Sequence, residues 1–276
     1  MPGILYVVAT PIGNLEDITF RAVRILREAD LIACEDTRHT RKLLDHYGIH
    51  KPAVSYHEHN EETRAVELVA RLQAGAAIAL VSDAGTPLIS DPGYRLVTKA
   101  LEHGIPVQAI PGPSALLTAL AASGLPTDSF HFAGFLPAKI SQRRKALERL
   151  RDEPSTLVLY EAPHRIRGTL EDIAALLGDR PVVVAREMTK IHEEFLRGTA
   201  GSLARDLAGR PPLKGELTLL IARSPAPPAV ELPISEAVEG AMRTGISRMD
   251  AMKLVARHRH ISKREVYRLL QRTGET

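Results

Sequence analysis

Short apolar runs alternate with amphipathic stretches through the first half of the chain. The apolar runs have the length of buried strands and cover Leu5–Ala9, Leu31–Cys34, Ala53–Tyr56, Ala76–Val81 and Pro106–Ile110. The stretches between and after them have helical spacing and cover 19–29, 37–47, 61–73, 92–103 and 113–122. Strands that alternate with helices of about ten residues indicate βαβ units. Strands that are apolar throughout indicate a parallel sheet with helices on both faces.

The second half of the chain has a different pattern. Strands are predicted at Phe130–Gly134, Thr156–Tyr160, Val182–Arg186, Glu193–Arg197 and Glu216–Ala222, with helices near 139–151, 164–177 and 199–208. The short gap around Thr189–Lys190 favours antiparallel pairing of its two flanking strands, so we expect a mixed sheet. These patterns predict two α/β domains, at residues 1–122 and 123–224.

A proline-rich segment, 223–230, predicts an extended linker, and a module of three short helices is expected at 231–276. Ser235 is expected to cap the first helix, and Ser262 with Glu265 to form a capping box on the third. The pattern is that of a helix-turn-helix. Nucleic-acid contact, dimerisation and a merely solvated surface all remain open for it.

Two further features of this module can be read from spacing. Ser247 and Asp250 resemble a capping pair for the second helix. On the third helix, basic residues at positions i, i+4 and i+8 form one stripe: Arg264, Arg268 and Arg272.

Charge and composition narrow the class of protein. The 276 residues are 44% hydrophobic, and the longest apolar run, Ala115–Ala122, falls short of the roughly 18 residues of a membrane span. No basic residue precedes Arg21, so we expect no signal peptide. The single cysteine, Cys34, excludes an intramolecular disulfide and fits a cytoplasmic location. Residues 240–276 hold nine Lys and Arg against three acids, a net +6 in a chain of net +3, which favours a polyanionic partner.

Several common motifs are missing from the sequence. No two glycines stand two apart, so there is no GxGxxG fingerprint, and neither a P-loop nor an HExxH helix occurs. His57 and His59 form an HxH pair without a nearby third ligand, so we expect no metal site.

Three unusual loops follow predicted parallel strands. They are rich in Gly and Pro and cover Thr10–Asn14, Ser82–Gly93 and Pro111–Ser114. The carboxyl edge of an open α/β sheet is where small ligands bind, and bare backbone can approach a ligand closely there. We therefore predict a ligand site at this edge, with the loops as mere connections as the alternative. Within the second loop, Asp91 is expected to cap and Pro92 to open the next helix.

Six strings of this sequence closely resemble the ribosomal RNA small-subunit methyltransferase I group of the tetrapyrrole methylase superfamily. They are YVVATPIGN (Tyr6–Asn14), CEDTR (Cys34–Arg38), VSDAGTPLISDPG (Val81–Gly93), IPGPSA (Ile110–Ala115), YEAPHR (Tyr160–Arg165) and KGE (Lys214–Glu216). The resemblance covers the whole chain. It implies two α/β domains, S-adenosylmethionine in the cleft between them, and a homodimer. The implied reaction is 2′-O-methylation of the cytidine conventionally numbered 1402 in the decoding region of 16S ribosomal RNA, within the small subunit.

The resemblance also implies which residues bind the cofactor. Carried onto this sequence they are Ile12, Asp83, Gly85, Thr86, Ile89, Ser114, Ala115, Tyr160, Glu161, Ala162, Gly215, Glu216 and Leu217. The first loop of the superfamily is usually richer in glycine than Ala9–Gly13, which is itself typical of the ribosomal group.

A ribose 2′-hydroxyl is a weak nucleophile, so a group that accepts its proton would help. The candidates are acidic or basic residues near predicted strand ends: Glu35, Asp36, His57, Asp91, Glu161, and Glu187 with Lys190. Simpler roles exist for several of them, since Asp36 can cap a helix and Glu187 can pair with Arg186 or Lys190. The identity of the base stays open.

RNA contacts are expected from clusters of basic residues. They are Arg38, Arg41 and Lys42, then Arg143, Arg144 and Lys145, and the stripe of the last helix. Because aromatics make up only 4% of the chain and Trp is absent, base stacking is not expected to be the main device of recognition. A structured target such as an assembled subunit is favoured.

Two other functions compete with this interpretation. A tetrapyrrole or protein-side-chain methylase of the same superfamily would have no need of the +6 tail. A non-enzymatic nucleic-acid-binding regulator would have no need of the three specialised loops.

Overall fold

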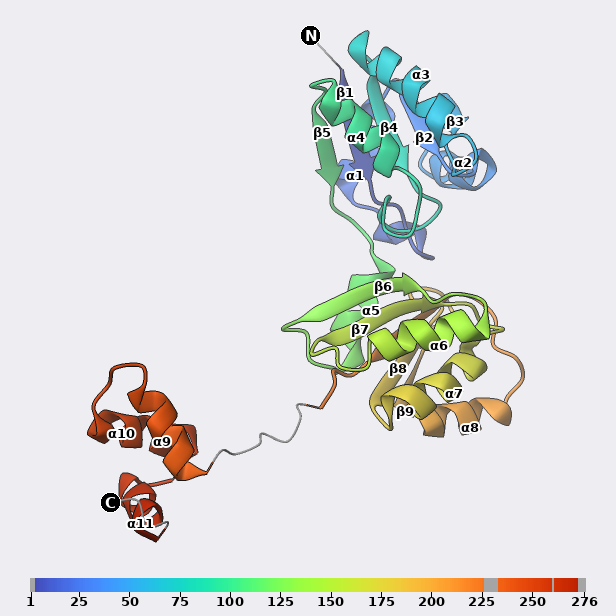
Figure 1. Cartoon of the computed structure of the whole chain (residues 1–276). Coiled ribbons are helices and arrows are strands. Elements are labelled where there is room, and N and C mark those ends of the chain that lie inside the picture. The colour runs from blue at the N-terminus through green and yellow to red at the C-terminus, as the bar shows by residue number, and fades with distance from the viewer. Residues whose placement is uncertain (1–2, 226–232, 260, 273–276) are drawn as a thin grey trace. The chain divides into compact units, whose positions relative to one another are not determined.

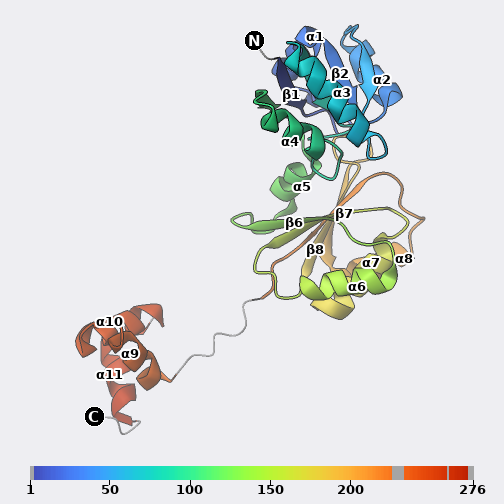
Figure 2. The same ribbon diagram turned by 45° about the horizontal axis from the view of Figure 1, so that its top comes forward.

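The computed structural model describes residues 3–225, 233–259 and 261–272 of the chain. It divides into two compact units, Met1–Ser224 and Pro225–Thr276. Figure 1 shows the α/β architecture of the first unit and the helices of the second, and Figure 2 shows the same chain turned.

The first half of the larger unit is built on a parallel sheet. Its strands are β1 (Ile4–Val8), β2 (Leu31–Cys34), β3 (Ala53–Ser55), β4 (Ala77–Val81) and β5 (Val107–Ile110), in the order β3-β2-β4-β1-β5. The helical elements are η1 (Leu15–Asp17), α1 (Phe20–Glu28), α2 (Thr37–His46), α3 (Glu61–Gln73) and α4 (Tyr94–Glu102). We call this sheet with its helices the first lobe.

Both faces of the first sheet are covered, which explains its wholly apolar strands. Ile32 and Cys34 of β2 pack in a cluster with α1 and α2, while Leu31 and Ala33 pack in another with α3 and α4. Alternate residues therefore enter different clusters, and no polar position is left in the strand.

The second half is built on a mixed sheet, as predicted. Its strands are β6 (Phe130–Phe135), β7 (Thr156–Glu161), β8 (Pro181–Arg186), β9 (Glu194–Thr199) and β10 (Leu217–Ile221), in the order β6-β7-β10-β8-β9. Only the β6–β7 pair is parallel; the other pairs are antiparallel. The helices are α5 (Ala115–Ser123), α6 (Ile140–Arg149), α7 (Ile166–Leu177) and α8 (Ala200–Ala208). We call this sheet with α5–α8 the second lobe, because α5 packs against its strands.

The two lobes are joined by direct contacts. Ile12, in the loop after β1, lies in the apolar cluster between α5 and the second sheet. The backbone N–H of Asn14 donates to Thr189 Oγ1 of the β8–β9 loop at 3.0 Å. A Cβ on Gly13 would meet the side chains of Thr189 and Lys190, so the loops of the two lobes press closely together here.

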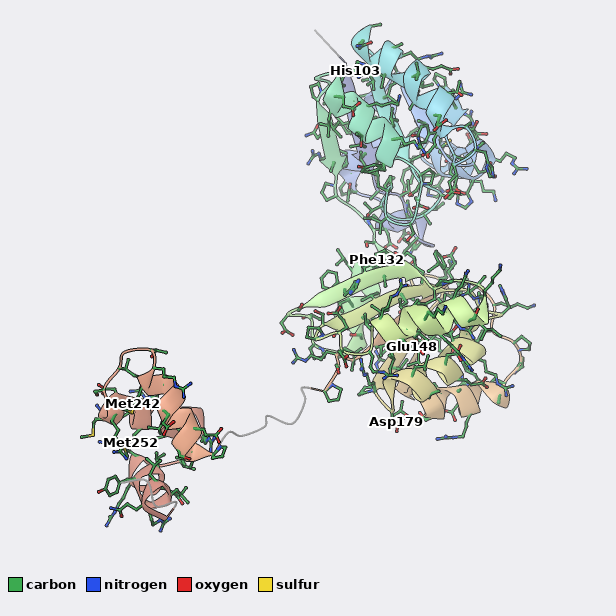
Figure 3. All side chains as sticks on the ribbon, in the orientation of Figure 1. His103, Phe132, Glu148, Asp179, Met242 and Met252 are labelled. Carbon is green, nitrogen blue, oxygen red and sulfur yellow. The ribbon has the colours of Figure 1, made fainter. Side chains whose placement is uncertain are left out.

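The smaller unit contains α9 (Ile234–Met242), α10 (Arg248–His258) and α11 (Lys263–Arg272) in the part that the structure describes; we call residues 233–272 the C-terminal module. A small core includes Val238, Met252 and Val266. Figure 3 draws the described side chains of the chain and labels Met252. The three predicted helices are confirmed. Most of the predicted linker, residues 226–230, lies outside the described residues.

The predicted caps of the C-terminal module have mixed outcomes. The N–H of Asp250 donates to Ser247 Oγ, and that of Glu265 donates to Ser262 Oγ, both at 3.2 Å. The prediction for Ser235 is wrong, because α9 begins at Ile234 and its N-cap is Pro233, two residues before Ser235. Pro233 has a φ of −43° and a ψ of 143°, a non-helical conformation as expected at an N-cap, and no side chain caps the helix.

Candidate active site

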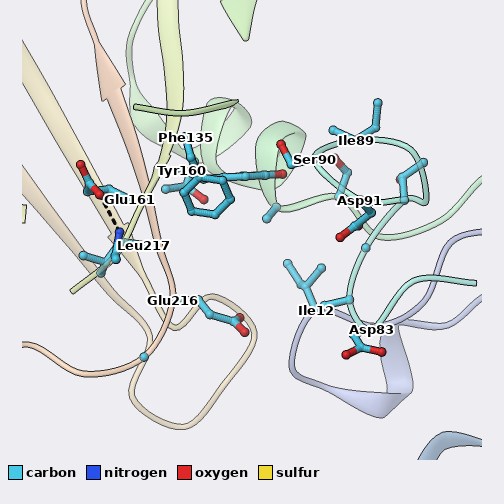
Figure 4. Close-up of a pocket in the computed structure, with 18 of the residues that line it drawn as sticks. Ile12, Asp83, Ile89, Ser90, Asp91, Phe135, Tyr160, Glu161, Glu216 and Leu217 are labelled. Carbon is cyan, nitrogen blue, oxygen red and sulfur yellow. Dashed lines mark hydrogen bonds between the residues drawn. The ribbon is translucent and has the colours of Figure 1, made fainter. Parts of the chain in front are cut away.

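The three glycine- and proline-rich loops meet at one pocket. The pocket has a volume of about 340 Å³ and lies between the loops of the first lobe and strand ends of the second (Figure 4). Its walls include all thirteen residues that the resemblance implies for the cofactor. Six further residues line it that the sequence did not point to as cofactor contacts: Ala84, Ser90, Asp91, Phe135, Pro163 and Thr218.

Backbone hydrogen bonds hold the first-lobe loops in place. Thr10 and Gly85 exchange two N–H···O bonds of 2.9 Å, and Thr86 Oγ1 donates to the carbonyl of Pro113 at 3.3 Å. Gly85 has a φ of +80°, and a Cβ there would stand 3.4 Å from Ile12. Because this left-handed conformation strains other residues, glycine is required where the loop turns along the pocket wall.

The pocket is acidic. Asp83, Asp91, Glu161 and Glu216 line it, and none of the described residues that line it is Lys, Arg or His. Burial raises the pKa of Asp91 to about 6, the nearby charges of Glu35 and Asp83 add to this, and the Ser82 hydroxyl opposes it. The pKa of Glu35 is likewise raised, first by burial and then by Asp83.

Asp91 does not cap the next helix, so that prediction is wrong. The N-cap is Gly93, with a φ of +141°, and α4 begins at Tyr94. The preceding residues Leu88 and Ser90 also have positive φ. This irregular backbone leaves Asp91 in the pocket wall instead of at the helix (Figure 4).

Two of the base candidates are already engaged elsewhere. Glu161 is only 2% exposed and accepts hydrogen bonds from Thr169 Oγ1 at 2.6 Å and from the N–H of Ala162 at 2.8 Å. Arg165 Nε lies 3.2 Å from the same carboxylate. Asp36 is the N-cap of α2, where hydrogen bonds from Arg38 lower its pKa to about 2.

His57 lies outside the residues that line the pocket. Its Nε2 is 3.3 Å from the Asn60 amide, and its buried Nδ1 has no hydrogen-bond partner among the described residues. The structure therefore does not bring His57 together with the residues of the pocket.

Glu187 and Lys190 reach the pocket through Glu216. Lys190 Nζ lies 2.8 Å from Glu187 Oε1 and 3.2 Å from Glu216 Oε2. The hydrogen bond from Lys190 holds the pKa of Glu187 below its usual value. Burial opposes the charge of Lys190, but both carboxylates outweigh burial and raise its pKa. Glu187 and Thr189 have positive φ, so the β8–β9 loop that carries Glu187 and Lys190 is strained.

The predicted RNA contacts of the larger unit differ in how far their side chains are exposed to solvent. Arg38, Arg41 and Lys42 on α2 are exposed, although Arg38 pairs with Asp36 at 2.8 Å. The prediction for Arg143 is wrong: it is 6% exposed, and its guanidinium lies 2.6 Å from Asp172.

The other predicted basic contacts are exposed, apart from one side chain that lies outside the described residues. Arg144 and Lys145 beside Arg143 are exposed. On α11, Arg264 is exposed and Arg268 pairs with Glu265 at 3.0 Å. The side chain of Arg272 lies outside the described residues.

Comparison with known proteins agrees with this architecture. A family model described as Tetrapyrrole (Corrin/Porphyrin) Methylases matches residues 4–204. The chain belongs to this family. It is 50% identical over 273 residues to the ribosomal RNA small subunit methyltransferase I of Halalkalibacterium halodurans, covering 97% of this chain and 94% of that protein. The protein of the same name from Synechocystis sp. is 49% identical over 271 residues, covering 97% of each. These similarities confirm the predicted group within the family.

Solved structures share the fold at lower identity. One is the uroporphyrin-III C-methyltransferase of Thermus thermophilus complexed with S-adenyl homocysteine. It has a TM-score of 0.55 and 23% identity, covering 79% of this chain and 97% of that one. The predicted fold class, a tetrapyrrole methylase-like chain with a parallel and then a mixed sheet, is confirmed.

The described residues lack two kinds of feature. They contain no helix that is long and apolar enough to cross a membrane. They also contain no group of three or more His, Cys, Asp or Glu side chains placed to hold a metal ion.

Proposed function

We propose that this chain transfers a methyl group from S-adenosylmethionine to the 2′-hydroxyl of cytidine 1402 in 16S ribosomal RNA. The proposal includes the small ribosomal subunit as substrate, a homodimer as the active form, and the cytoplasm as location. The observation that carries it is that all thirteen residues of the group's cofactor pattern line one acidic pocket. The RNA substrate is proposed from the name that these relatives share, since they are similar to this chain over nearly its full length.

The pocket residues fit this cofactor. S-adenosylmethionine carries a sulfonium and an ammonium cation against a single carboxylate, and Asp83, Asp91 and Glu216 supply charge opposite to its net positive charge. Ile12, Ile89 and Leu217 supply apolar surface for its neutral parts. A fold neighbour bound to S-adenyl homocysteine supports the same choice. When bound, the cofactor supplies an activated methyl group with a neutral thioether as leaving group.

The work left to the protein is alignment and proton acceptance. Loops tied together by Thr10–Gly85 and Thr86–Pro113 bonds hold the walls of the pocket rigid, which favours a fixed approach of the two reactants. Two base candidates line the pocket: Glu161 lies beside Arg165, whereas the carboxylate of Asp91 forms no ion pair with any described residue. With a pKa of about 6 it is ionised at neutral pH, and we assign it the proton of the 2′-hydroxyl.

The RNA backbone needs a different surface. Phosphates are repelled by four carboxylates, so the basic residues must hold the polyanion outside the pocket. We assign this purpose to the exposed members of the predicted set, which are Arg38, Arg41, Lys42, Arg144, Lys145 and the α11 residues Arg264 and Arg268.

The test uses small subunits from a strain that lacks the gene. Incubation with the purified chain and S-adenosylmethionine should add one methyl group to the ribose of cytidine 1402, detected by mass analysis of nuclease fragments. Subunits reconstituted with a 2′-deoxy nucleotide at that position should bind but accept no methyl group. Methyl transfer to the deoxy substrate would make a base atom the acceptor and would refute the proposed reaction.

A further inference from the structure

Aromatic side chains are scarce in this chain, yet three of them meet at the pocket. The sequence has five Phe, six Tyr and no Trp. The ring of Tyr160 contacts Phe132 at a centroid distance of 5.0 Å and Phe135 at 5.5 Å. Phe135 and Tyr160 both line the pocket (Figure 4). The first pair is T-shaped and the second is tilted, arrangements that are favourable for aromatic rings, so the three rings form one cluster.

A β-bulge makes this cluster possible. In a regular strand Phe132 and Phe135, three residues apart, would face opposite sides of the sheet. The register of β6 against β7 shifts between Phe132 and Gly134, and Gly134 has a φ of +62°. The extra residue turns Phe135 back onto the ring that Phe132 also contacts. Bulges next to functional sites commonly redirect a side chain in this way.

The bulge also lies against the other lobe. A Cβ on Gly134 would stand 3.5 Å from Ser90 Oγ of the Ser82–Gly93 loop. The aromatic cluster therefore lies where the Ser82–Gly93 loop of the first lobe meets the second lobe.

The inner and outer rings of the cluster differ in exposure. Tyr160 is largely covered, and burial raises the pKa of its hydroxyl, with an opposing contribution from the backbone of Leu116. Phe135 is 57% exposed. The Tyr160 ring is thus a fixed support, and Phe135 is a ring at the mouth that has surface free for a further partner.

We propose that Phe135 is a stacking platform for the nucleobase of the nucleotide that receives the methyl group. This rests on the proposed function. The phosphates of an RNA strand are repelled by the acidic lining, whereas a neutral nucleobase can stack on a phenyl ring at no electrostatic cost. The platform belongs to the acceptor and not to the cofactor adenine because it lies at the solvent-exposed rim, where a substrate arriving from solution enters.

Kinetics on small subunits test the platform. Phe135→Ala should lower kcat/KM for subunits lacking the methyl group by about 5- to 100-fold, the range expected for one lost base stack. The affinity for S-adenosylmethionine, measured by calorimetry, should stay unchanged and also shows that the variant is folded. Phe135→Tyr should keep most of the activity. Phe130→Ala is the matched control, because Phe130 is 41% exposed on the same strand but does not line the pocket.

Fluorescence gives an independent readout, because the chain has no tryptophan. Phe135→Trp introduces a single indole at the platform, and stacking of a nucleobase should quench its emission when subunits are added. Phe130→Trp should show no change on the same addition.

The outcomes separate the platform from the proposed function. Unaltered kcat/KM for Phe135→Ala, or an equal loss for Phe130→Ala, overturns the platform while the proposed function stands. A parallel loss of S-adenosylmethionine affinity assigns the ring to the cofactor and also overturns it. If the unaltered chain does not methylate the subunits, the proposed function fails and the platform fails with it.

Discussion

The pocket and the C-terminal module carry opposite charge. Four carboxylates and, within its described lining, no cationic side chain surround the pocket. Residues 240–276 hold nine Lys and Arg against three acids. An acidic cavity suits a cationic small molecule, and a basic helical surface suits a polyanion.

This separation of charge explains how one chain can bind both reactants of the proposed reaction. A basic pocket would attract phosphates into the space that the sulfonium requires. With the two charges kept on separate parts of the chain, the RNA backbone is attracted to one surface while only the neutral sugar and base enter the other. Substitutions and a truncation can test this division.

Arg143 should prove to be a structural cation with no part in RNA binding. Its guanidinium is paired with Asp172, which is also almost fully buried. Arg143→Ala leaves that carboxylate without its buried partner and should lower the free energy of unfolding by about 3–5 kcal/mol, measured by urea denaturation. Arg144→Ala removes an exposed partner of the same carboxylate and should cost less than about 1 kcal/mol. Equal costs would contradict this distinction.

Gly85→Val should abolish cofactor binding. The new side chain would project from a left-handed backbone position beside Ile12 and into the pocket wall. We expect the affinity for S-adenosylmethionine to fall at least about 100-fold, equivalent to about 3 kcal/mol. Gly48→Val is the control, since Gly48 has a φ of +61° with nothing within 4 Å of its would-be Cβ. The control should share the backbone strain but bind the cofactor normally; retained binding by Gly85→Val would move the site.

A chain that ends at Ser224 should keep the acidic pocket and lose the basic C-terminal module. Residues 1–224 form a compact unit and contain every residue that lines the pocket, so cofactor affinity should be unchanged. Affinity for the small subunit should fall by about 10- to 100-fold, and its dependence on salt concentration should flatten, because the basic residues that displace counterions are gone. Equal affinity and an equal salt slope would assign the module to dimerisation or stability.

Asp91→Asn should weaken cofactor binding only where the carboxylate is ionised. At pH 8 we expect a loss of about 3- to 10-fold in affinity for S-adenosylmethionine. Because the pKa is about 6, the loss should shrink as the pH falls through 6 and vanish near pH 4.5. A pH-independent loss would mean that the carboxylate acts through its shape and not through its charge.

The same substitution should have the opposite effect on stability. A carboxyl with a raised pKa takes up a proton on folding, so its contribution is complete below pH 3.8 and is lost as the pH rises through 6. Asn cannot ionise, so above pH 6 Asp91→Asn should be more stable than the parent by about 1 kcal/mol, after allowance for solvent screening. Urea denaturation at pH 4 and pH 8 measures this difference.

Elements with a clear periodicity could be predicted from sequence. Strand β2 was placed at Leu31–Cys34 because all of its residues are apolar, and both of its faces are covered by helices. The mixed second sheet followed from the short gap between β8 and β9, which pair antiparallel. Local chemistry of this kind needs no knowledge of distant partners.

Errors arose where a distant partner or the exact local backbone conformation decides the outcome. Arg143 is charged and stands beside Arg144 and Lys145, so it resembles a surface cation; its partner Asp172 lies on another helix, which spacing cannot reveal. Ser235 and Asp91 have the right side chains for caps, but Pro233 and Gly93 provide the backbone conformations at which the helices begin.

The candidate site was predicted better through its loops than through its strands. Glycine, proline and loop position identify Gly85, Thr86 and Ser114, whereas Phe135 was missed. The strand was expected to end at Gly134, and period-two alternation does not survive a bulge. A glycine inside an otherwise regular strand was the available signal.

The place of β10 in the second sheet has a consequence for how the protein is made. β10, the last strand of the larger unit, inserts between β7 and β8 and pairs with both. A chain growing from its N-terminus has all five strands of the first sheet once Ile110 is available, so the first lobe can fold during translation. The second sheet must wait with two unpaired apolar edges until Leu217–Ile221 emerges. Chains that stall before this strand should therefore be the aggregation-prone form of the protein.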